Sequence, residues 1–328
     1  MLIDSPLSFR TTLPLAHSSS MPLFMRPLKL RYGMAKRITV KVPVRIDLAG
    51  GWTDVPAYCN GQTGEVVNIA IDRYVTASCE IDDQRRVQVR YETEMPTGCG
   101  LGTSGAMNVA LLAAISPSDE HPSVIAEKAF QFEAVLGNTG GRQDQWASAF
   151  GGIQHLRFEH DLVHRTGLNP SAEFCAWMEH HLLLFDTGLP HVSGDLHKSV
   201  WKRFEEGDEE ISSGLEFLRL AAQSMHKAVV EEDKTAFKEA MRMVMKGVDM
   251  LNPGLHDPFR GVLDSLENSG ELTAWKAMGA GGGGVVGLLR SNNSSPESII
   301  QHLEDTGWKH LPWTIEVSGM TRDVFNHE

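Results

Sequence analysis

Apolar and polar residues follow a period of two in three stretches near the start of the chain. Residues 38–42 alternate, residues 65–77 are rich in Val and Ile, and residues 87–91 alternate again. Successive side chains of a strand point to opposite faces, so this pattern predicts β-strands. The polar residues 82–84 predict a turn between the second and third strands.

Helical patterns follow. Residues 107–115 form an apolar, alanine-rich run, residues 123–136 end at a glycine, and residues 196–251 interleave Glu and Lys with Leu, Met, Ala and Phe. These stretches predict helices. With the strands, the pattern by itself predicts a mixed α/β protein.

The chain divides where the pattern breaks. Residues 168–171 are polar and irregular, and a new hydrophobic strand begins near residue 181. We therefore expect an N-terminal domain over 37–172 and a C-terminal domain over 173–328, the second ending in a helix over 298–305 and a strand over 314–317.

The first 36 residues differ from the rest. They have no acidic residue after Asp4 and no clear periodicity, and Met34 stands just before the first strand. We expect residues 1–36 to be a disordered extension or the product of a misassigned start. A transit peptide is the alternative.

Composition excludes several classes of protein. A net charge of -12 and a pI near 5.6 argue against a nucleic-acid partner, and no apolar run is long enough to span a bilayer. The four cysteines are far apart and form no C-x-x-C pair, so neither a disulfide scaffold nor a zinc site is expected. We expect a cytoplasmic protein, and its oligomeric state is not readable from the sequence.

A glycine loop precedes the alanine-rich helix. Residues 96–106 read Pro-Thr-Gly-Cys-Gly-Leu-Gly-Thr-Ser-Gly-Ala. Glycines leave backbone N–H groups uncovered, and the start of a helix favours an anion, so the loop predicts a phosphate site. A dinucleotide-binding fold is disfavoured because residues 92–96 separate the loop from the strand before it. A P-loop is excluded because no glycine precedes a Lys-Ser or Lys-Thr pair.

A second segment, residues 43–54, combines charges with glycines. Arg45 and Asp47 alternate with apolar residues and should share a strand face, and a double glycine then turns the chain toward Asp54. The residues alone leave open that Arg45 and Asp54 form a structural ion pair.

A third segment, residues 140–152, places glycines around a short helix that begins near Asp144. An aspartate there suits either a helix cap or a base that accepts a hydroxyl proton, and the residues alone favour the cap. Glu133 lies near the end of the preceding predicted helix, where a carboxylate opposes the helix dipole. We therefore expect a cation or a donor beside it.

The three segments in this order resemble the motifs of the GHMP kinases, the superfamily of galactokinase, homoserine kinase and mevalonate kinase. The loop has the form P-x-G-x-G-L-G-[ST]-S. The forms A-G-G-W-T-D-x-P and G-G-x-Q-D-Q-[WY]-A-x-A-F-G-G are most similar to the L-fucose kinases and the D-glycero-D-manno-heptose 7-phosphate kinases. The resemblance runs from about Val42 to the C-terminus. It implies an α+β, two-domain GHMP kinase fold: a ribosomal protein S5 domain 2-like N-terminal domain and a ferredoxin-like C-terminal domain.

The resemblance also implies an activity and a set of site residues. It implies an ATP-dependent sugar kinase that uses Mg²⁺ and acts on an anomeric hydroxyl, with Asp144 as the base and Arg45 steadying the transferring phosphoryl group. Ser104 and Glu133 would hold the Mg²⁺, whose preferred ligands are oxygens. The implied ATP-binding residues are Pro96, Gly98, Gly100, Leu101, Gly102, Thr103, Ser104 and Gly105. The implied acceptor-binding residues are Asp47, Gly51, Trp52, Thr53, Asp54, Gly281 and Gly282.

The last two belong to a late glycine run at residues 279–284, which is similar to the superfamily motif K-x-[ST]-G-A-G-G-G-G-x. Met278 replaces the usual Ser or Thr before the first glycine. The hydroxyl contact of that motif is therefore missing.

The alternatives concern the acceptor and whether the protein is catalytic. The resemblance implies an L-fucose-like hexose or a heptose 7-phosphate, and the second would need a basic subsite from Arg73, Arg142 or Lys198. A kinase for a small alcohol is disfavoured because apolar residues would then replace the Asp47 and Asp54 pair. A non-catalytic sugar sensor is disfavoured by the intact Ser104, Glu133 and Asp144 set. The expected partner is a small sugar or sugar phosphate, with no nucleic acid and no membrane.

Overall fold

The computed structural model describes residues 36–82, 84, 86–137, 140–189, 193–279 and 281–326. Within these ranges, no helix combines the length and apolar character needed to cross a membrane. The predicted extension over 1–36 lies outside the described residues, apart from Lys36, where the first strand begins.

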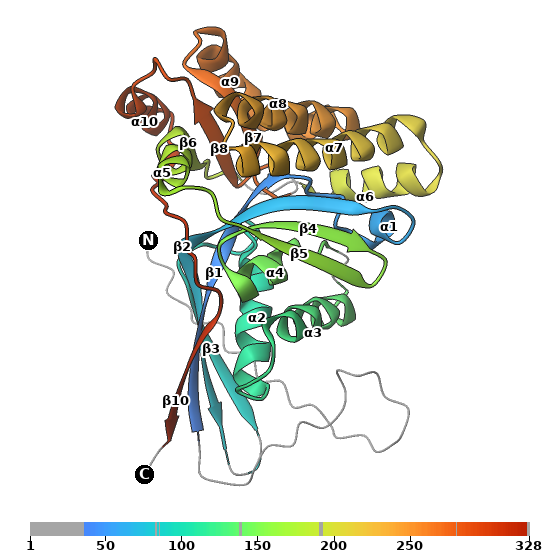
Figure 1. Ribbon diagram of the computed structural model, residues 1–328, viewed down its shortest axis with the longest axis vertical. Coiled ribbons are helices and arrows are strands. Elements are labelled where there is room, and N and C mark those ends of the chain that lie inside the picture. The colour runs from blue at the N-terminus through green and yellow to red at the C-terminus, as the bar shows by residue number, and fades with distance from the viewer. Residues whose placement is uncertain are drawn as a thin grey trace.

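A six-stranded antiparallel sheet runs through the lower and middle parts of the molecule (Figure 1). Its strands are β1 (Lys36–Ala49), β2 (Gly64–Ile81), β3 (Val87–Thr93), β4 (Ile153–Glu159), β5 (Leu162–Leu168) and β10 (Thr321–Asn326). The order is β10-β1-β2-β4-β5, and β3 pairs with β2. The strands predicted around residues 38–42, 65–77 and 87–91 are confirmed.

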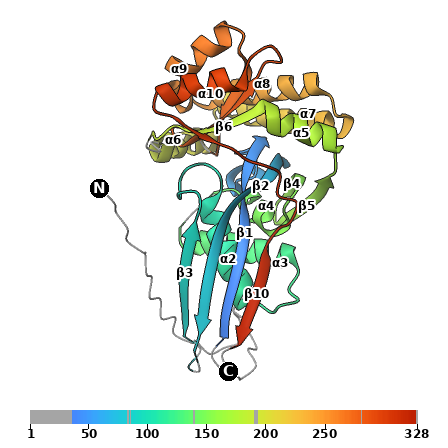
Figure 2. The same cartoon turned by 90° about the vertical axis from the view of Figure 1, so that its left-hand side faces the viewer.

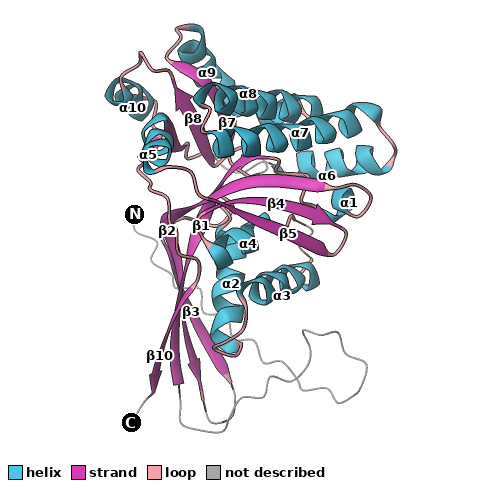
Figure 3. Cartoon of the chain, viewed as in Figure 1, coloured by secondary structure: helices cyan, strands magenta, loops and turns pink. Residues whose placement is uncertain are grey.

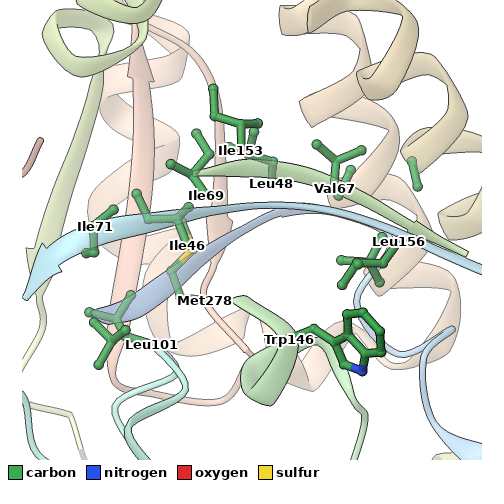
Figure 4. Close-up of a cluster of buried hydrophobic side chains, with 14 of the residues drawn as sticks. Ile46, Leu48, Val67, Ile69, Ile71, Leu101, Trp146, Ile153, Leu156 and Met278 are labelled. Carbon is green, nitrogen blue, oxygen red and sulfur yellow. The ribbon is translucent and has the colours of Figure 1, made fainter. Parts of the chain in front are cut away.

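Short and long helices cover the sheet. They are α1 (Pro56–Cys59), α2 (Thr103–Ile115), α3 (Pro122–Val135) and α4 (Gln143–Phe150). Helices α2 and α4 contact β1 and β2, and α3 packs on α2 and α4. Their apolar faces meet the sheet in a continuous core, in which Ile46, Ile69 and Leu101 are fully buried (Figure 4). The glycine loop is thereby fixed to the core through Leu101.

A second, four-stranded antiparallel sheet lies above the first (Figure 1). It has the order β7-β8-β6-β9, with β6 (Leu182–Asp186), β7 (Leu272–Ala277), β8 (Val285–Arg290) and β9 (Lys309–Leu311). Its helices are α5 (Ala172–His181), α6 (Ser193–Glu205), α7 (Glu209–Glu231), α8 (Lys234–Leu251), η2 (Pro253–Leu255), α9 (Asp257–Asn268) and α10 (Pro296–Asp305). Helices α8 and α9 contact β7, and α5 contacts β6 and β8 (Figure 3).

The two sheets are joined by packing as well as by the chain. Helix α7 contacts β1 and β2 of the first sheet, and it also contacts α8, which packs on β7 of the second sheet. Figure 1 shows α7 on the side of these strands away from α2. Helix α7 therefore links the first sheet to the helices that accompany the second.

The end of the chain returns to the first sheet. Strand β10 pairs with β1 in the first sheet, where Figure 2 shows the two side by side, so residues 173–328 do not all belong to the second sheet. The predicted strand over 314–317 is wrong: only Ile315 makes a bridge there, to Ile71. The segment is extended, but its hydrogen bonds reach both Ala70 and Gly152, which prevents a regular ladder. The boundary near residue 172 stays a prediction.

Candidate active site

The glycine loop takes the conformation that its composition predicts. Gly98, Gly100 and Gly102 have φ of +78°, +92° and +78°, values that residues with a Cβ rarely adopt. Gly102 is the N-cap of α2, so no side chain caps the first turn of that helix. The N–H groups of this turn therefore remain available to an anion.

The loop is braced by the late glycine run of the second part. A Cβ on Gly100 would lie 2.3 Å from the carbonyl oxygen of Met278, and one on Gly284 would lie 2.6 Å from that of Cys99. The amide of Val285 donates to the Cys99 carbonyl at 2.8 Å. The glycines thus allow two backbones to meet at contact distance.

We expect Gly100→Ala to destabilise the protein by about 1–3 kcal/mol and to weaken nucleotide binding, because the methyl group would push the loop from Met278. Gly98→Ala is the matched control. Gly98 shares the positive φ but has no atom within 4 Å of the added Cβ. Thermal unfolding of both variants checks the expectation, and equal losses would contradict the role given to the contact.

Asp144 and Arg45 form an ion pair beside the loop. Arg45 Nε donates to Asp144 Oδ1 at 2.8 Å, a second guanidinium nitrogen lies 2.6 Å from the same oxygen, and Arg45 also donates to the Gly100 carbonyl. Burial alone would lower the pKa of Arg45, but the charges of Asp144 and Asp47 outweigh it and the pKa is raised. The ion pair suggested by the residues alone, Arg45 with Asp54, is replaced by Arg45 with Asp144.

Asp144 also lies against the glycines themselves. A Cβ on Gly105 would approach the Asp144 Cβ to 2.6 Å, and one on Gly102 would come within 3.0 Å of its Cγ. Asp144 stands in the first turn of α4, but the N-cap is Arg142. Asp144 is therefore not the cap that the residues alone favoured.

Ser104 and Glu133 are in contact beside the loop. Ser104 Oγ donates to Glu133 Oε1 at 2.8 Å, Asn108 donates to the same oxygen at 2.7 Å, and Gln145 donates to Oε2 at 2.6 Å. Glu133 is 7% exposed, and burial, with the charge of Asp144, raises its pKa. The donor expected beside Glu133 is thus confirmed, because three side chains donate a hydrogen bond to its carboxylate.

The end of β1 and the loop after it bring two more carboxylates, Asp47 and Asp54, to the site. Asp54 Oδ2 accepts from the amide of Gln143 at 3.1 Å, and Asp54 is 2% exposed. Burial, supported by the charges of Asp144 and Asp47, raises the pKa of Asp54 to about 7. Asp47 is also 2% exposed, and its Oδ1 has no hydrogen-bond partner among the described residues.

The remaining predicted acceptor residues shape this loop. Thr53 Oγ1 donates to the carbonyl of Glu65 at 2.9 Å, and Trp52 has a positive φ of 83°. A Cβ on Gly51 would lie 2.2 Å from Asp47 Oδ2, so only glycine fits. The Trp52 ring packs on His197 and Trp201 of α6, which therefore borders the loop.

The other predicted residues are held by different contacts. Pro96 is exposed and Leu101 is buried in the core. Gly281 and Gly282 contact Leu255: a Cβ on Gly281 would lie 3.1 Å from the Leu255 Cβ, and the Gly282 amide donates to the Leu255 carbonyl.

The three candidates for a basic subsite, Arg73, Arg142 and Lys198, lie in different surroundings. Arg73 donates to the carbonyls of Asp72 and Pro312, and Arg142 lies over the Phe130 ring and 3.5 Å from Asp161. Lys198 is exposed on α6, the helix that borders Trp52. Lys198 and Arg142 are thus both on elements next to the acceptor loop, since Gln143, which follows Arg142, donates to Asp54.

Sequence reasoning missed Lys276 on β7. Its Nζ lies 2.9 Å from Asp47 Oδ2 and donates to the Asp47 carbonyl at 2.6 Å. The signal in the sequence is that this lysine stands three residues before Gly279, at the Lys position of the motif K-x-[ST]-G-A-G-G-G-G-x. Asn108 and Gln145, which hold Glu133, were missed because their contacts depend on three helices meeting.

Comparisons with known proteins match this arrangement. Residues 66–152 match the family described as GHMP kinases N terminal domain, a range that includes the glycine loop, Glu133 and Asp144. This part of the chain is a GHMP kinase N-terminal domain. ATP is the phosphoryl donor of that superfamily.

Two relatives extend the similarity beyond the GHMP domain. The bifunctional fucokinase/GDP-fucose pyrophosphorylase of Arabidopsis thaliana is 24% identical, over 82% of this chain and 31% of that protein. The D-glycero-alpha-D-manno-heptose 7-phosphate kinase of Campylobacter jejuni is 23% identical, over 76% of this chain and 88% of that protein. The chain thus spans under a third of the plant protein but most of the bacterial one.

A solved structure shows that the similarity of fold extends over most of the chain. A D-glycero-D-manno-heptose 1-phosphate kinase from Bacteroides thetaiotaomicron superposes with a TM-score of 0.69 at 18% identity, covering 87% of this chain and 98% of that one. The predicted α+β GHMP kinase fold is confirmed.

Proposed function

We propose that the protein is an ATP-dependent kinase that transfers the γ-phosphoryl group to the anomeric hydroxyl of a sugar or sugar phosphate. The observation that supports it most is the position of Asp144. Its carboxylate contacts the glycine loop on one side, and the loop carrying Asp54 meets α4 at Gln143 on the other. A base between the phosphate site and the acceptor loop is the geometry that phosphoryl transfer needs.

The residues have distinct roles in this proposal. The glycine loop and the first turn of α2 bind the phosphates of ATP, and Asp144 accepts the proton of the attacking hydroxyl. Arg45, fixed to both Asp144 and the Gly100 carbonyl, places positive charge where the phosphoryl group moves. Asp54, Thr53 and Trp52 form the acceptor side.

Mg²⁺ is part of the proposal, with Ser104 and Glu133 as its protein ligands. The donor set fits the ion, because a hydroxyl and a buried carboxylate lie 2.8 Å apart and both are oxygen ligands. When bound, the ion would offset negative charge on the phosphate oxygens. Apart from that, Ser104 and Asn108 keep the Glu133 carboxylate oriented toward the loop.

We expect Glu133→Gln to raise the Mg²⁺ concentration needed for half-maximal activity by roughly tenfold, because the ligand loses its charge. Glu127→Gln is the control. Glu127 stands on the same helix and accepts a hydrogen bond from Trp146 of α4, as Glu133 does from Gln145. A magnesium titration of both variants checks this, and an unchanged midpoint in Glu133→Gln would remove Glu133 from the metal site.

The activity itself is tested by ATP consumption with a panel of acceptors. The panel contains L-fucose, other free hexoses, heptose 7-phosphate and mevalonate. Turnover with a sugar and none with mevalonate is the expected result. ATP consumption with mevalonate alone would replace the proposal with a small-alcohol kinase, and no turnover with any acceptor would support a non-catalytic protein.

A further inference from the structure

A lysine of the second sheet reaches into the first-sheet side of the candidate site. Lys276 is on β7 and Asp47 is on β1, 229 positions away in the chain. The ammonium group lies 2.9 Å from Asp47 Oδ2 and donates to the Asp47 carbonyl at 2.6 Å. The two side chains are 4% and 2% exposed, so water screens the pair very little.

The surroundings of the pair are those of the site. Asp47 Oδ2 is also held against Gly51, where a Cβ would lie 2.2 Å away. Arg45 and Asp54 are close enough to act on the charge of Lys276. Burial lowers the pKa of Lys276, and Asp47 opposes that effect.

Lys276 supplies one of the two positive charges in an acidic cluster. Asp47, Asp54 and Asp144 supply three carboxylates, and Arg45 and Lys276 supply two cations. Removing Lys276 would leave one cation among three acids. A buried ion pair adds little net stability compared with well-packed apolar residues, so stability alone is a poor reason for this one.

We propose that Lys276 is a positioning residue of the kinase site: it holds Asp47 against the acceptor loop at Gly51 and offsets part of the negative charge that gathers on the acceptor side. Its role in acceptor binding rests on the proposed function, whereas its electrostatic role does not. Lys276 thus makes acceptor recognition depend on the contact between the two sheets.

The test compares Lys276→Met with Lys276→Arg. In Lys276→Met we expect the KM for the sugar to rise at least about tenfold while the KM for ATP changes less than about threefold. We also expect the acidic midpoint of kcat/KM to move to higher pH, because a carboxyl that loses a nearby cation holds its proton more tightly. Lys276→Arg keeps the charge and should keep the wild-type midpoint.

Two further measurements separate the possible failures. The titration of ¹³C-labelled aspartate carboxyl groups by NMR needs no activity, and in Lys276→Met it should show an aspartate titrating at higher pH than in the wild type. If Lys276→Met does not fold, the double variant Lys276→Met with Asp47→Asn removes both charges and is compared with Asp47→Asn alone.

The outcomes are distinct. An unchanged sugar KM together with unchanged carboxyl titration in Lys276→Met would overturn the inference. Equal rises in the KM for sugar and for ATP, without a pH shift, would reduce Lys276 to a structural residue and also overturn it. A wild-type protein that phosphorylates no acceptor would end the proposed function, while the NMR titration would still decide the electrostatic role of Lys276.

Discussion

Asp144→Asn should lower kcat by roughly 10²–10⁴-fold and leave the affinity for ATP nearly unchanged, because the variant keeps the shape of the side chain but cannot accept a proton. Asparagine is preferable to alanine here. Arg45 is almost fully buried, and its partner Oδ1 should stay in place as an acceptor. Turnover at saturating substrates, with nucleotide affinity measured by calorimetry, checks the expectation.

The control for this variant is Asp161→Asn. Asp161, like Asp144, lies beside an arginine: it is 3.5 Å from Arg142, at the start of α4. The side chain of Asp161 is fully exposed. Its loss should change turnover by less than about twofold, as expected for a surface pair. If Asp144→Asn keeps turnover within about threefold of the wild type, Asp144 is not the base.

The local parts of the site could be predicted from the sequence. The glycine loop, the start of α2 and the position of Asp144 near the start of α4 depend on residues close together in the chain, so spacing and propensity are enough. The roles of Ser104 and Glu133 came only from the resemblance, and the structure brings them into contact.

The contacts between distant segments could not be predicted. Arg45 has Asp54 as its nearest acidic candidate beyond Asp47 in sequence, yet it pairs with Asp144, 99 positions away. Lys276 meets Asp47 only because β7 packs near the end of β1. No periodicity carries such information, since it describes which face of an element is buried and not what buries it.

The same limit applies to the C-terminal strand. The segment around residues 314–317 looks like a strand because Thr, Ile and Val are frequent there. This segment instead connects the second sheet to the first, and β10, which follows it, pairs with β1. The pairing is explained by the edge of the first sheet at β1, which would otherwise be unpaired.

Asp54→Asn should stabilise the protein at alkaline pH, although it removes a group from the acceptor site. Asp54 is buried beside two other carboxylates, and its pKa is raised to about 7 from an ordinary value near 3.8. Above the unfolded-state pKa the unfolded chain releases this proton while the folded chain keeps it. Wild-type stability therefore falls as pH rises from about 4 to about 7, and the loss is complete above that range.

The size of the effect follows from the shift. A rise in the pKa of Asp54 from near 3.8 to about 7 corresponds to about 4 kcal/mol of unfolding free energy that the wild type loses at high pH. The stability advantage of Asp54→Asn over the wild type should therefore grow by about 3 kcal/mol between pH 5 and pH 8.5. Asparagine keeps an oxygen for the Gln143 amide, so the loop retains its hydrogen bond. Denaturant unfolding of both proteins at the two pH values measures the difference.

The control is Asp249→Asn. Asp249 is a half-buried carboxylate whose pKa is lowered by hydrogen bonds from His256 and Arg260, which outweigh its burial. Its stability contribution has the opposite sign: it is present above the unfolded-state pKa and lost as pH falls, so this variant should be destabilised at both pH values. A stability difference for Asp54→Asn that is the same at both pH values would mean that Asp54 is already ionised in the folded protein at the lower pH. The three site aspartates would then carry full charge, and Arg45 and Lys276 would have to balance all of it.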